Sequence, residues 1–172
     1  MYFLCVASLG ATHFLLGEIF MKITFCGHFH IPQEYMIDDY VYEEIIKAIN
    51  NGADTFYVTT FGKFNAIALR TLKRFKKEKF PHITIIGISP IMDIPVHIAN
   101  SCDEIIEIPN AKEGDLYNRR CLKAMKYAAD CSDGVICFVT NFISMSFLIY
   151  NYIKKKNKII VNLKDRYEHY FE

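Results

Sequence analysis

The sequence lacks the residue spacings with which cysteine and histidine usually hold a metal ion. Its six cysteines include no C-x-x-C pair, and none lies near a histidine at zinc-ligand spacing. Cys26 and Cys137 stand in apolar runs, where cysteine behaves as a small buried hydrophobic residue. We therefore predict no metal site, no cofactor and a chain that works in the reducing cytoplasm.

The sequence also has little excess charge. Its formal net charge is +1, which gives no electrostatic reason for binding nucleic acid or an anionic membrane. Basic residues gather locally at 72–80 and 154–158, and we interpret both clusters as solvated helix ends. We expect neither nucleic acid nor a membrane as a partner.

Neither of the two commonest nucleotide-binding loops is present. No G-x-G-x-x-G motif follows the first expected strand, and no G-x-x-x-x-G-K-[ST] motif occurs anywhere. These absences exclude the ordinary dinucleotide fingerprint and the P-loop. They leave other kinds of nucleotide site open.

The first twenty residues are apolar but have no basic segment and no small-x-small cleavage site before Met21. They also contain Gly10, Gly17 and Glu18. We interpret 1–20 as an extension outside the core fold, with a membrane anchor or an additional strand as the alternatives. Residues 21–172 are long enough for a single domain with an adequate core.

From Met21 onward, strand and helix patterns alternate. Strands are expected at 22–27, 55–60, 82–89, 134–139 and 158–163, with helices at 33–50, 64–78, 116–131 and 144–156. The segment 90–114 is expected to be irregular apart from a short strand at 104–108. Apolar strands that alternate with helices are typical of a parallel sheet covered on both faces. The pattern predicts an α/β fold, a Rossmann-like three-layer sandwich with a mainly parallel sheet.

In such sheets ligands bind beyond the carboxyl ends of the strands. The residues that follow the expected strands include glycines, which allow close backbone approach, neutral polar side chains, and helix starts with N–H groups for an anion. We predict a ligand site made of Gly27, His28, Thr60, Gly62, Asn65, Thr140, Asn141 and Ser144.

Each of these residues also has a structural interpretation. His28 is a candidate ligand contact or acid/base group, and equally a residue that caps the next helix or packs under its loop. Asn65 is a candidate ribose-binding or backbone-anchoring residue, or equally a helix N-terminal cap. Asp133, which precedes the strand at 134–139, is expected to cap or turn the chain there.

Several segments together resemble the SLOG superfamily, which unites the Lonely-guy phosphoribohydrolases with the DNA-processing protein A family. The segments are "GHF" after the first strand, "GKFN" at the second helix, "FPHITIIGISP", "CSDGVICFVT" and "KKKNKIIVNL". The resemblance covers about residues 21–163 and is strongest to small stand-alone bacterial members. It implies a Rossmann-like fold, a pocket for a nucleotide or nucleotide-derived ligand, and pairing of two copies into a homodimer.

The sequence departs from the motifs of that superfamily. Phe29 replaces an arginine after Gly-His, and Asn65 replaces an aspartate. Ser144 and Met145 replace a glycine pair, and Asn151 stands where the resemblance implies a carboxylate. N-glycosidic hydrolysis needs a carboxylate to stabilise cationic charge at the sugar, so these replacements favour binding over catalysis.

Three functions follow in order of preference. The first is a domain that binds a nucleotide-like small molecule without strong catalysis, and the second is a nucleoside 5′-monophosphate phosphoribohydrolase. The third is an interaction protein that has lost the ligand, in which apolar side chains fill the cleft or face a partner: Phe29, Phe61, Phe142 and Met145.

Overall fold

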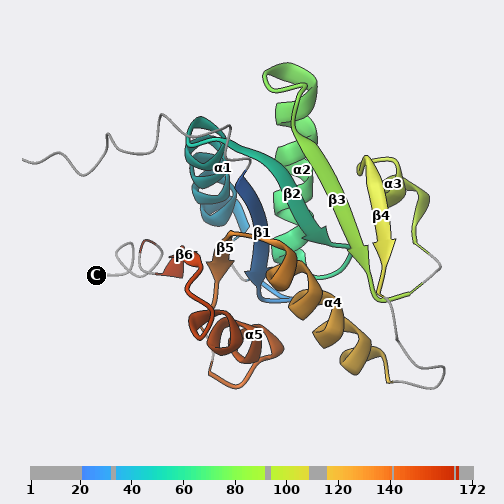
Figure 1. Ribbon diagram of the computed structural model, residues 1–172, viewed down its shortest axis with the longest axis vertical. Coiled ribbons are helices and arrows are strands. Elements are labelled where there is room, and N and C mark those ends of the chain that lie inside the picture. The colour runs from blue at the N-terminus through green and yellow to red at the C-terminus, as the bar shows by residue number, and fades with distance from the viewer. Residues whose placement is uncertain are drawn as a thin grey trace, which may run out of the picture.

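The computed structural model describes residues 21–31, 34–91, 94–108, 116–140, 142–164 and 166, so the extension at 1–20 lies outside the described part. Six strands form one sheet, and every pair of neighbouring strands is parallel (Figure 1). The strands are β1 (Met21–Gly27), β2 (Ala53–Thr59), β3 (Thr84–Ser89), β4 (Glu104–Glu107), β5 (Gly134–Phe138) and β6 (Ile159–Asn162). Their order in the sheet is β4-β3-β2-β1-β5-β6. The predicted α/β Rossmann-like class is confirmed.

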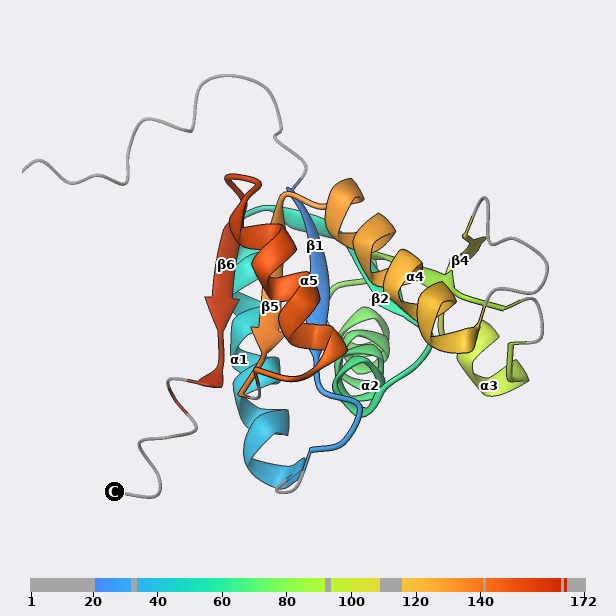
Figure 2. The ribbon, with the colours of Figure 1, turned by 90° about the horizontal axis from the view of Figure 1, so that it is seen from below.

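Helices lie on both faces of the sheet, with α1 and α2 behind it and α4 and α5 in front (Figures 1 and 2). Their bounds are α1 (Glu34–Asn50), α2 (Lys63–Glu78), α3 (Val96–Ala99), α4 (Tyr117–Cys131) and α5 (Met145–Lys154). The expectation of an irregular 90–114 was wrong at α3, a single helical turn between Pro95 and Asn100. Among the described helices, none is long and apolar enough to cross a membrane.

Alternation along the strands sorts their side chains between the two faces of the sheet. In β1, Phe25 packs with the α1 and α2 core, whereas Cys26 packs with the core under α4 and α5. Burial raises the pKa of the Cys26 thiol to about 12. This thiol is therefore an unreactive hydrophobic contact, as its apolar surroundings in the sequence predict.

The strand order reverses beside β1. The chain moves outward through β2, β3 and β4, then returns to the opposite side of β1 with β5. Sheets of this kind generally bind ligands at the carboxyl ends of the two strands that flank such a reversal. The ends of β1 and β5 are thus the first place to examine.

Candidate functional site

At the reversal point His28, just after β1, is hydrogen-bonded to Thr140, just after β5. The backbone N–H of Thr140 donates to His28 Nε2 at 2.8 Å, and the Thr140 hydroxyl oxygen lies 3.1 Å from the same nitrogen. Because Nε2 accepts a backbone proton, the imidazole is neutral and carries its proton on Nδ1. Burial lowers the pKa of His28, which favours the same neutral form. His28 therefore links the carboxyl ends of β1 and β5.

The space in front of Gly27 is occupied by a side chain of the core. A Cβ on this glycine would lie 2.3 Å from Cγ of Phe64, which is fully buried. The Gly27 carbonyl accepts a hydrogen bond from the buried Ser146 hydroxyl at 2.6 Å. The absence of a side chain at Gly27 makes room for Phe64, and Ser146 is a polar contact that the sequence analysis missed.

The N–H groups at two helix starts also have partners within the protein. The N–H of Lys63 donates to the carbonyl of Phe29 at 3.1 Å, and that of Phe64 to the carbonyl of His28 at 3.4 Å. At α5 the Ser144 hydroxyl accepts the N–H of Phe147 at 3.1 Å, as an N-terminal cap. These three N–H groups are not presented to an anion. Asn141 lies outside the described residues.

A hollow of about 480 Å³ lies one strand away, at the carboxyl end of β2. It runs between the first half of α2 and the segment of α3. Its lining comprises Thr59, Thr60, Phe61, Gly62, Asn65, Ala66, Leu69, Arg70, Lys73, His97, Ile98 and Ser101. Three of the predicted site residues, Thr60, Gly62 and Asn65, are therefore brought together here.

The structure gives each of these three residues a local role. Gly62 adopts φ +82°, a left-handed conformation that favours glycine, immediately before α2. The Asn65 side chain is buried and its Oδ1 accepts the N–H of Thr59 at 3.3 Å, so it anchors the end of β2 and does not cap the helix. The Thr60 hydroxyl donates to the Ser89 hydroxyl at 3.2 Å. A ligand role for the three stays a prediction.

Cationic side chains form part of the lining of the hollow. Arg70 makes an ion pair with Asp38 of α1 at 2.5 Å. Lys73 donates to the Ser101 hydroxyl at 3.1 Å, and within the described part of the chain no carboxylate lies within ion-pair distance of it. The hollow therefore contains one lysine whose charge no described carboxylate neutralises.

The donors in this lining suit an anion better than a metal ion. None of the described lining residues is Asp or Glu. Across the described ranges, no group of three His, Cys, Asp or Glu side chains is placed to hold a metal. The hydroxyls, the amide and the ammonium can hydrogen-bond an oxyanion, and Phe61 and Leu69 supply apolar area.

Among the lining residues that the sequence did not predict, four are polar: Arg70, Lys73, His97 and Ser101. We interpreted the basic cluster at 72–80 only as a solvated helix end. The spacing of Asn65, Leu69 and Lys73 was a usable signal, because residues four apart share one face of a helix. His97 and Ser101 gave no such signal, since α3 is a single turn.

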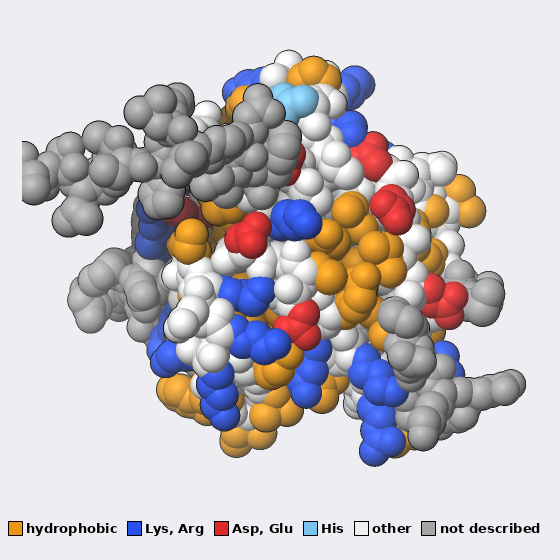
Figure 3. Space-filling view, viewed as in Figure 1, with side chains coloured by type: hydrophobic (Ala, Val, Ile, Leu, Met, Phe, Trp, Pro, Cys, Tyr) orange, Lys and Arg blue, Asp and Glu red, His pale blue; other side chains and the backbone are white. Residues whose placement is uncertain are grey.

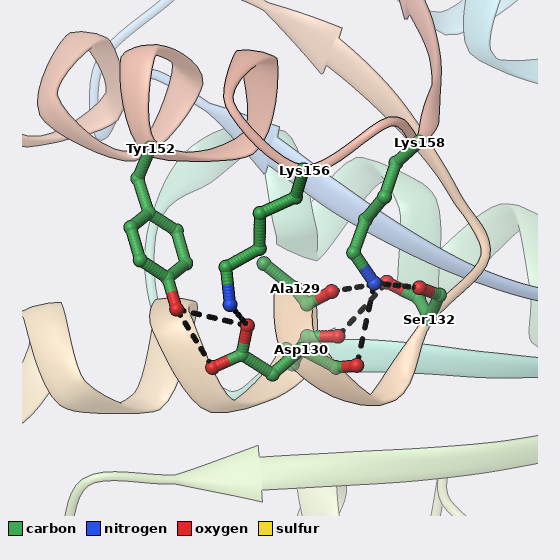
Figure 4. Close-up of polar contacts among 7 residues, drawn as sticks. Ala129, Asp130, Ser132, Tyr152, Lys156 and Lys158 are labelled. Carbon is green, nitrogen blue, oxygen red and sulfur yellow. Dashed lines mark hydrogen bonds and ion pairs between the residues drawn. The ribbon is translucent and has the colours of Figure 1, made fainter.

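A second polar cluster lies near the amino ends of the strands, opposite the hollow (Figure 4). Tyr152 and Lys156 of the α5 end donate to the Asp130 carboxylate, at 2.9 and 2.5 Å. Lys158 donates to the carbonyls of Asp130 and Ser132, at the C-terminus of α4. Burial opposes ionisation of Asp130, but the hydrogen bonds from Lys156 and Tyr152 outweigh it and lower its pKa. This cluster joins α4 to α5 and caps a helix, so it is structural.

Asp133, in the same region, behaves as the sequence predicted. Its carboxylate accepts the backbone N–H of Lys22 at 2.9 Å, and its own N–H donates to the Lys22 carbonyl at 2.7 Å. It fixes the chain between α4 and β5 beside the start of β1. It lies at the amino ends of the strands, away from the hollow.

Comparison with known proteins places the fold. No family model and no curated protein matches the sequence. Among solved structures, DNA processing protein A from Streptococcus pneumoniae matches with a TM-score of 0.63 and 12% identity. The chain is similar in fold to DNA processing protein A. The match covers 83% of this chain and 50% of the pneumococcal one.

A second match is to DNA processing protein A from Helicobacter pylori, a structure that describes a single-stranded DNA binding mode of that protein. Its TM-score is 0.61, with 16% identity over 83% of this chain and 64% of that chain. The chain thus spans about half of one relative in structure and less than two thirds of the other. The predicted resemblance to the DNA-processing protein A family is confirmed at the level of the fold.

Proposed function

We propose that this chain binds a nucleotide or nucleotide-derived small molecule in the hollow beside β2. The observation that carries the proposal is the meeting, in about 480 Å³, of neutral donors, a lysine and apolar side chains. That volume lies within the roughly 300–1,000 Å³ typical of small-molecule sites. Thr60, Asn65 and Lys73 supply polar contacts for phosphate and ribose, and Phe61 with Leu69 supplies a surface for a base.

The proposal is binding and not hydrolysis. The phosphoribohydrolase alternative needs a carboxylate near the sugar, and none of the described lining residues carries one. An assay that detected free base from AMP, GMP, CMP or UMP would reverse this preference.

We propose a small molecule and not single-stranded DNA as the partner. The DNA binding described for the Helicobacter protein belongs to that protein, of which the match covers 64%. The net charge of +1 gives no general attraction for a polyanion.

We also propose that two copies pair through the surface at the start of α5. Phe142 and Ile143 are 71% and 94% exposed, and Leu148 in the next turn is 60% exposed. Figure 3 shows hydrophobic side chains gathered along the lower rim of the molecule, over α5. Adjacent exposed apolar side chains are typical of an interaction surface. Sedimentation of the full chain should give a dimer, and Ile143→Asp should give a monomer; a monomeric wild type contradicts the pairing.

The ligand proposal is tested by thermal unfolding of the full chain with nucleoside mono-, di- and triphosphates, NAD and ADP-ribose. A ligand at a hundred times its dissociation constant adds about 2.7 kcal/mol to the stability, which is readily detected. Ala66 lies on the exposed surface of α2 and lines the hollow, so Ala66→Phe should fill the site and abolish the shift.

Lys77→Phe is the matched control, because Lys77 is also exposed on α2 but does not line the hollow. The control should keep the full shift. Silence of the wild type across the whole panel contradicts the proposed function, and an undiminished shift in Ala66→Phe contradicts the proposed location.

A further inference from the structure

Lys73 and Ser101 meet across the hollow and join its two walls. Lys73 projects from α2 and donates to the hydroxyl of Ser101, which follows α3, at 3.1 Å. The Ser101 hydroxyl in turn donates to the His97 carbonyl at 2.7 Å. The only proton of this hydroxyl is thus donated within the α3 segment, and its oxygen accepts the hydrogen bond from the Lys73 ammonium.

Lys73 differs from its cationic neighbours on α2 in the partner that it has. Arg70 is paired with Asp38 at 2.5 Å, and Lys76 with Asp103 at 2.6 Å. Within the described residues Lys73 has the neutral Ser101 hydroxyl instead. A phosphate offers this ammonium a full negative charge, which the Ser101 hydroxyl lacks, so an incoming oxyanion is the better partner.

The wall that Ser101 belongs to is lightly packed. None of the four residues of α3 is buried, and Val96 at its start is 73% exposed. Releasing Ser101 from Lys73 therefore sacrifices few apolar contacts.

We propose that Lys73 binds the phosphate group of the ligand, and that it gives up Ser101 to do so. This inference rests on the proposed function and specifies its ligand class: molecules that carry a terminal phosphate, in preference to the uncharged nucleosides. Lys73 is then the residue that determines specificity, and Ser101 is an internal competitor for its ammonium.

The test is calorimetric titration of the full chain with AMP and, separately, with adenosine. Lys73→Met should weaken AMP binding about tenfold, the scale of one charge-assisted hydrogen bond, and should leave adenosine binding unchanged. Ser101→Ala should strengthen AMP binding about threefold, because the competitor is gone. Lys77→Met removes the same charge from an exposed position of α2 outside the hollow, and should bind AMP like the wild type.

Three results overturn the inference while the proposed function stands. They are AMP binding that Lys73→Met leaves intact, equal weakening by Lys73→Met and Lys77→Met, and weaker AMP binding by Ser101→Ala. The last would mean that Ser101 contacts the ligand. Failure of the wild type to bind AMP or any other phosphate in the panel overturns the proposed function and the inference together.

Discussion

Two places along the carboxyl edge of this sheet look alike in sequence and differ in structure. At the reversal point between β1 and β5, the polar groups are bonded to one another, with His28 accepting the N–H of Thr140 at 2.8 Å. Beside β2 a hollow of about 480 Å³ remains, and its Lys73 has a neutral hydroxyl as partner. Both places have glycine, small polar residues and a following helix.

The difference shows that hydrogen-bonding groups at strand ends indicate a site only when they remain available. A backbone N–H that already has a protein acceptor contributes to stability, and a ligand must break that bond before it can bind. The reversal point is where Rossmann-like sheets usually bind ligands. In this chain the cation with only a neutral partner, Lys73, lies one strand away, on α2.

The largest expected effect comes from disrupting the packing at the reversal point. Gly27→Ala places a Cβ 2.3 Å from Phe64 Cγ, and both the ring and its own Cβ are in the way. We expect a loss of about 3 kcal/mol of unfolding free energy, the upper range for overpacking, measured by urea denaturation.

Gly134→Ala is the matched control for that change. Its Cβ would come too close to one atom, Cδ1 of Ile23 at 2.8 Å, which is the flexible end of a side chain, while the nearest atoms of Ile159 lie at an ordinary contact distance of 3.6 Å. It should lose less stability than Gly27→Ala. Equal losses would mean that the packing of Phe64 against Gly27 is not what makes the reversal point intolerant of a side chain.

The next effect concerns the floor of the hollow. Asn65→Ala leaves the buried N–H of Thr59 without its side-chain acceptor, and we expect a loss of about 2 kcal/mol. Ala66→Ser, on the exposed neighbour that also lines the hollow, should change stability far less. A loss no larger in Asn65→Ala than in Ala66→Ser would contradict the anchoring role of the amide.

The reversal point, unlike the hollow, should make the stability of the protein depend on pH through His28. The folded-state pKa of His28 is lowered by burial, so the unfolded chain binds this proton more readily than the folded one. The contribution of His28 to stability is therefore present above its unfolded pKa of about 6.5 and is lost as the pH falls below it.

We expect the wild type to lose stability between about pH 7.5 and about pH 5, and His28→Gln to lose less over the same range. The measurement is urea denaturation at both pH values. His30→Gln, an exposed histidine of the same loop, should behave like the wild type. Identical pH profiles for all three proteins would contradict a neutral His28 at the reversal point.

The smallest expected change in stability concerns the polar cluster of Asp130 at the amino ends of the strands. Asp130→Asn weakens the contacts with Lys156 and Tyr152, and we expect a smaller loss of stability than in Asn65→Ala because Asp130 and Lys156 are exposed. Ligand binding should be unchanged. Altered AMP affinity in this variant would show that the amino ends of the strands influence the hollow, and it would contradict this expectation.

The fold could be predicted because its signals are local and repeated. Apolar strands such as 82–89 specify the layers, and so does the expected helix stripe of Met36, Tyr40, Val41, Ile45 and Ile49. Val41, Ile45 and Ile49 are buried and Tyr40 is partly buried, while the side chain of Met36 lies outside the described part. The single turn of α3 was not predictable, since four residues, none of them buried, produce no periodic pattern.

The site could be predicted only in part, for a physical reason. The sequence places His28 and Asn65 at strand ends, but it does not reveal which hydrogen-bond partner each side chain has in the folded protein. Partners such as Thr140 and Ser146 come from more than 110 residues away. Whether a polar group is available to a ligand depends on those distant partners.

The central claim is that the ligand binds in the hollow and not at the reversal point. Its most direct test is nuclear magnetic resonance of the ¹⁵N-labelled full chain during titration with AMP. The account predicts that the largest shifts of backbone N–H signals fall at Thr60, Gly62, Ala66 and Ser101. Shifts centred on His28, Thr140 and Ser144, with the hollow unaffected, would contradict it.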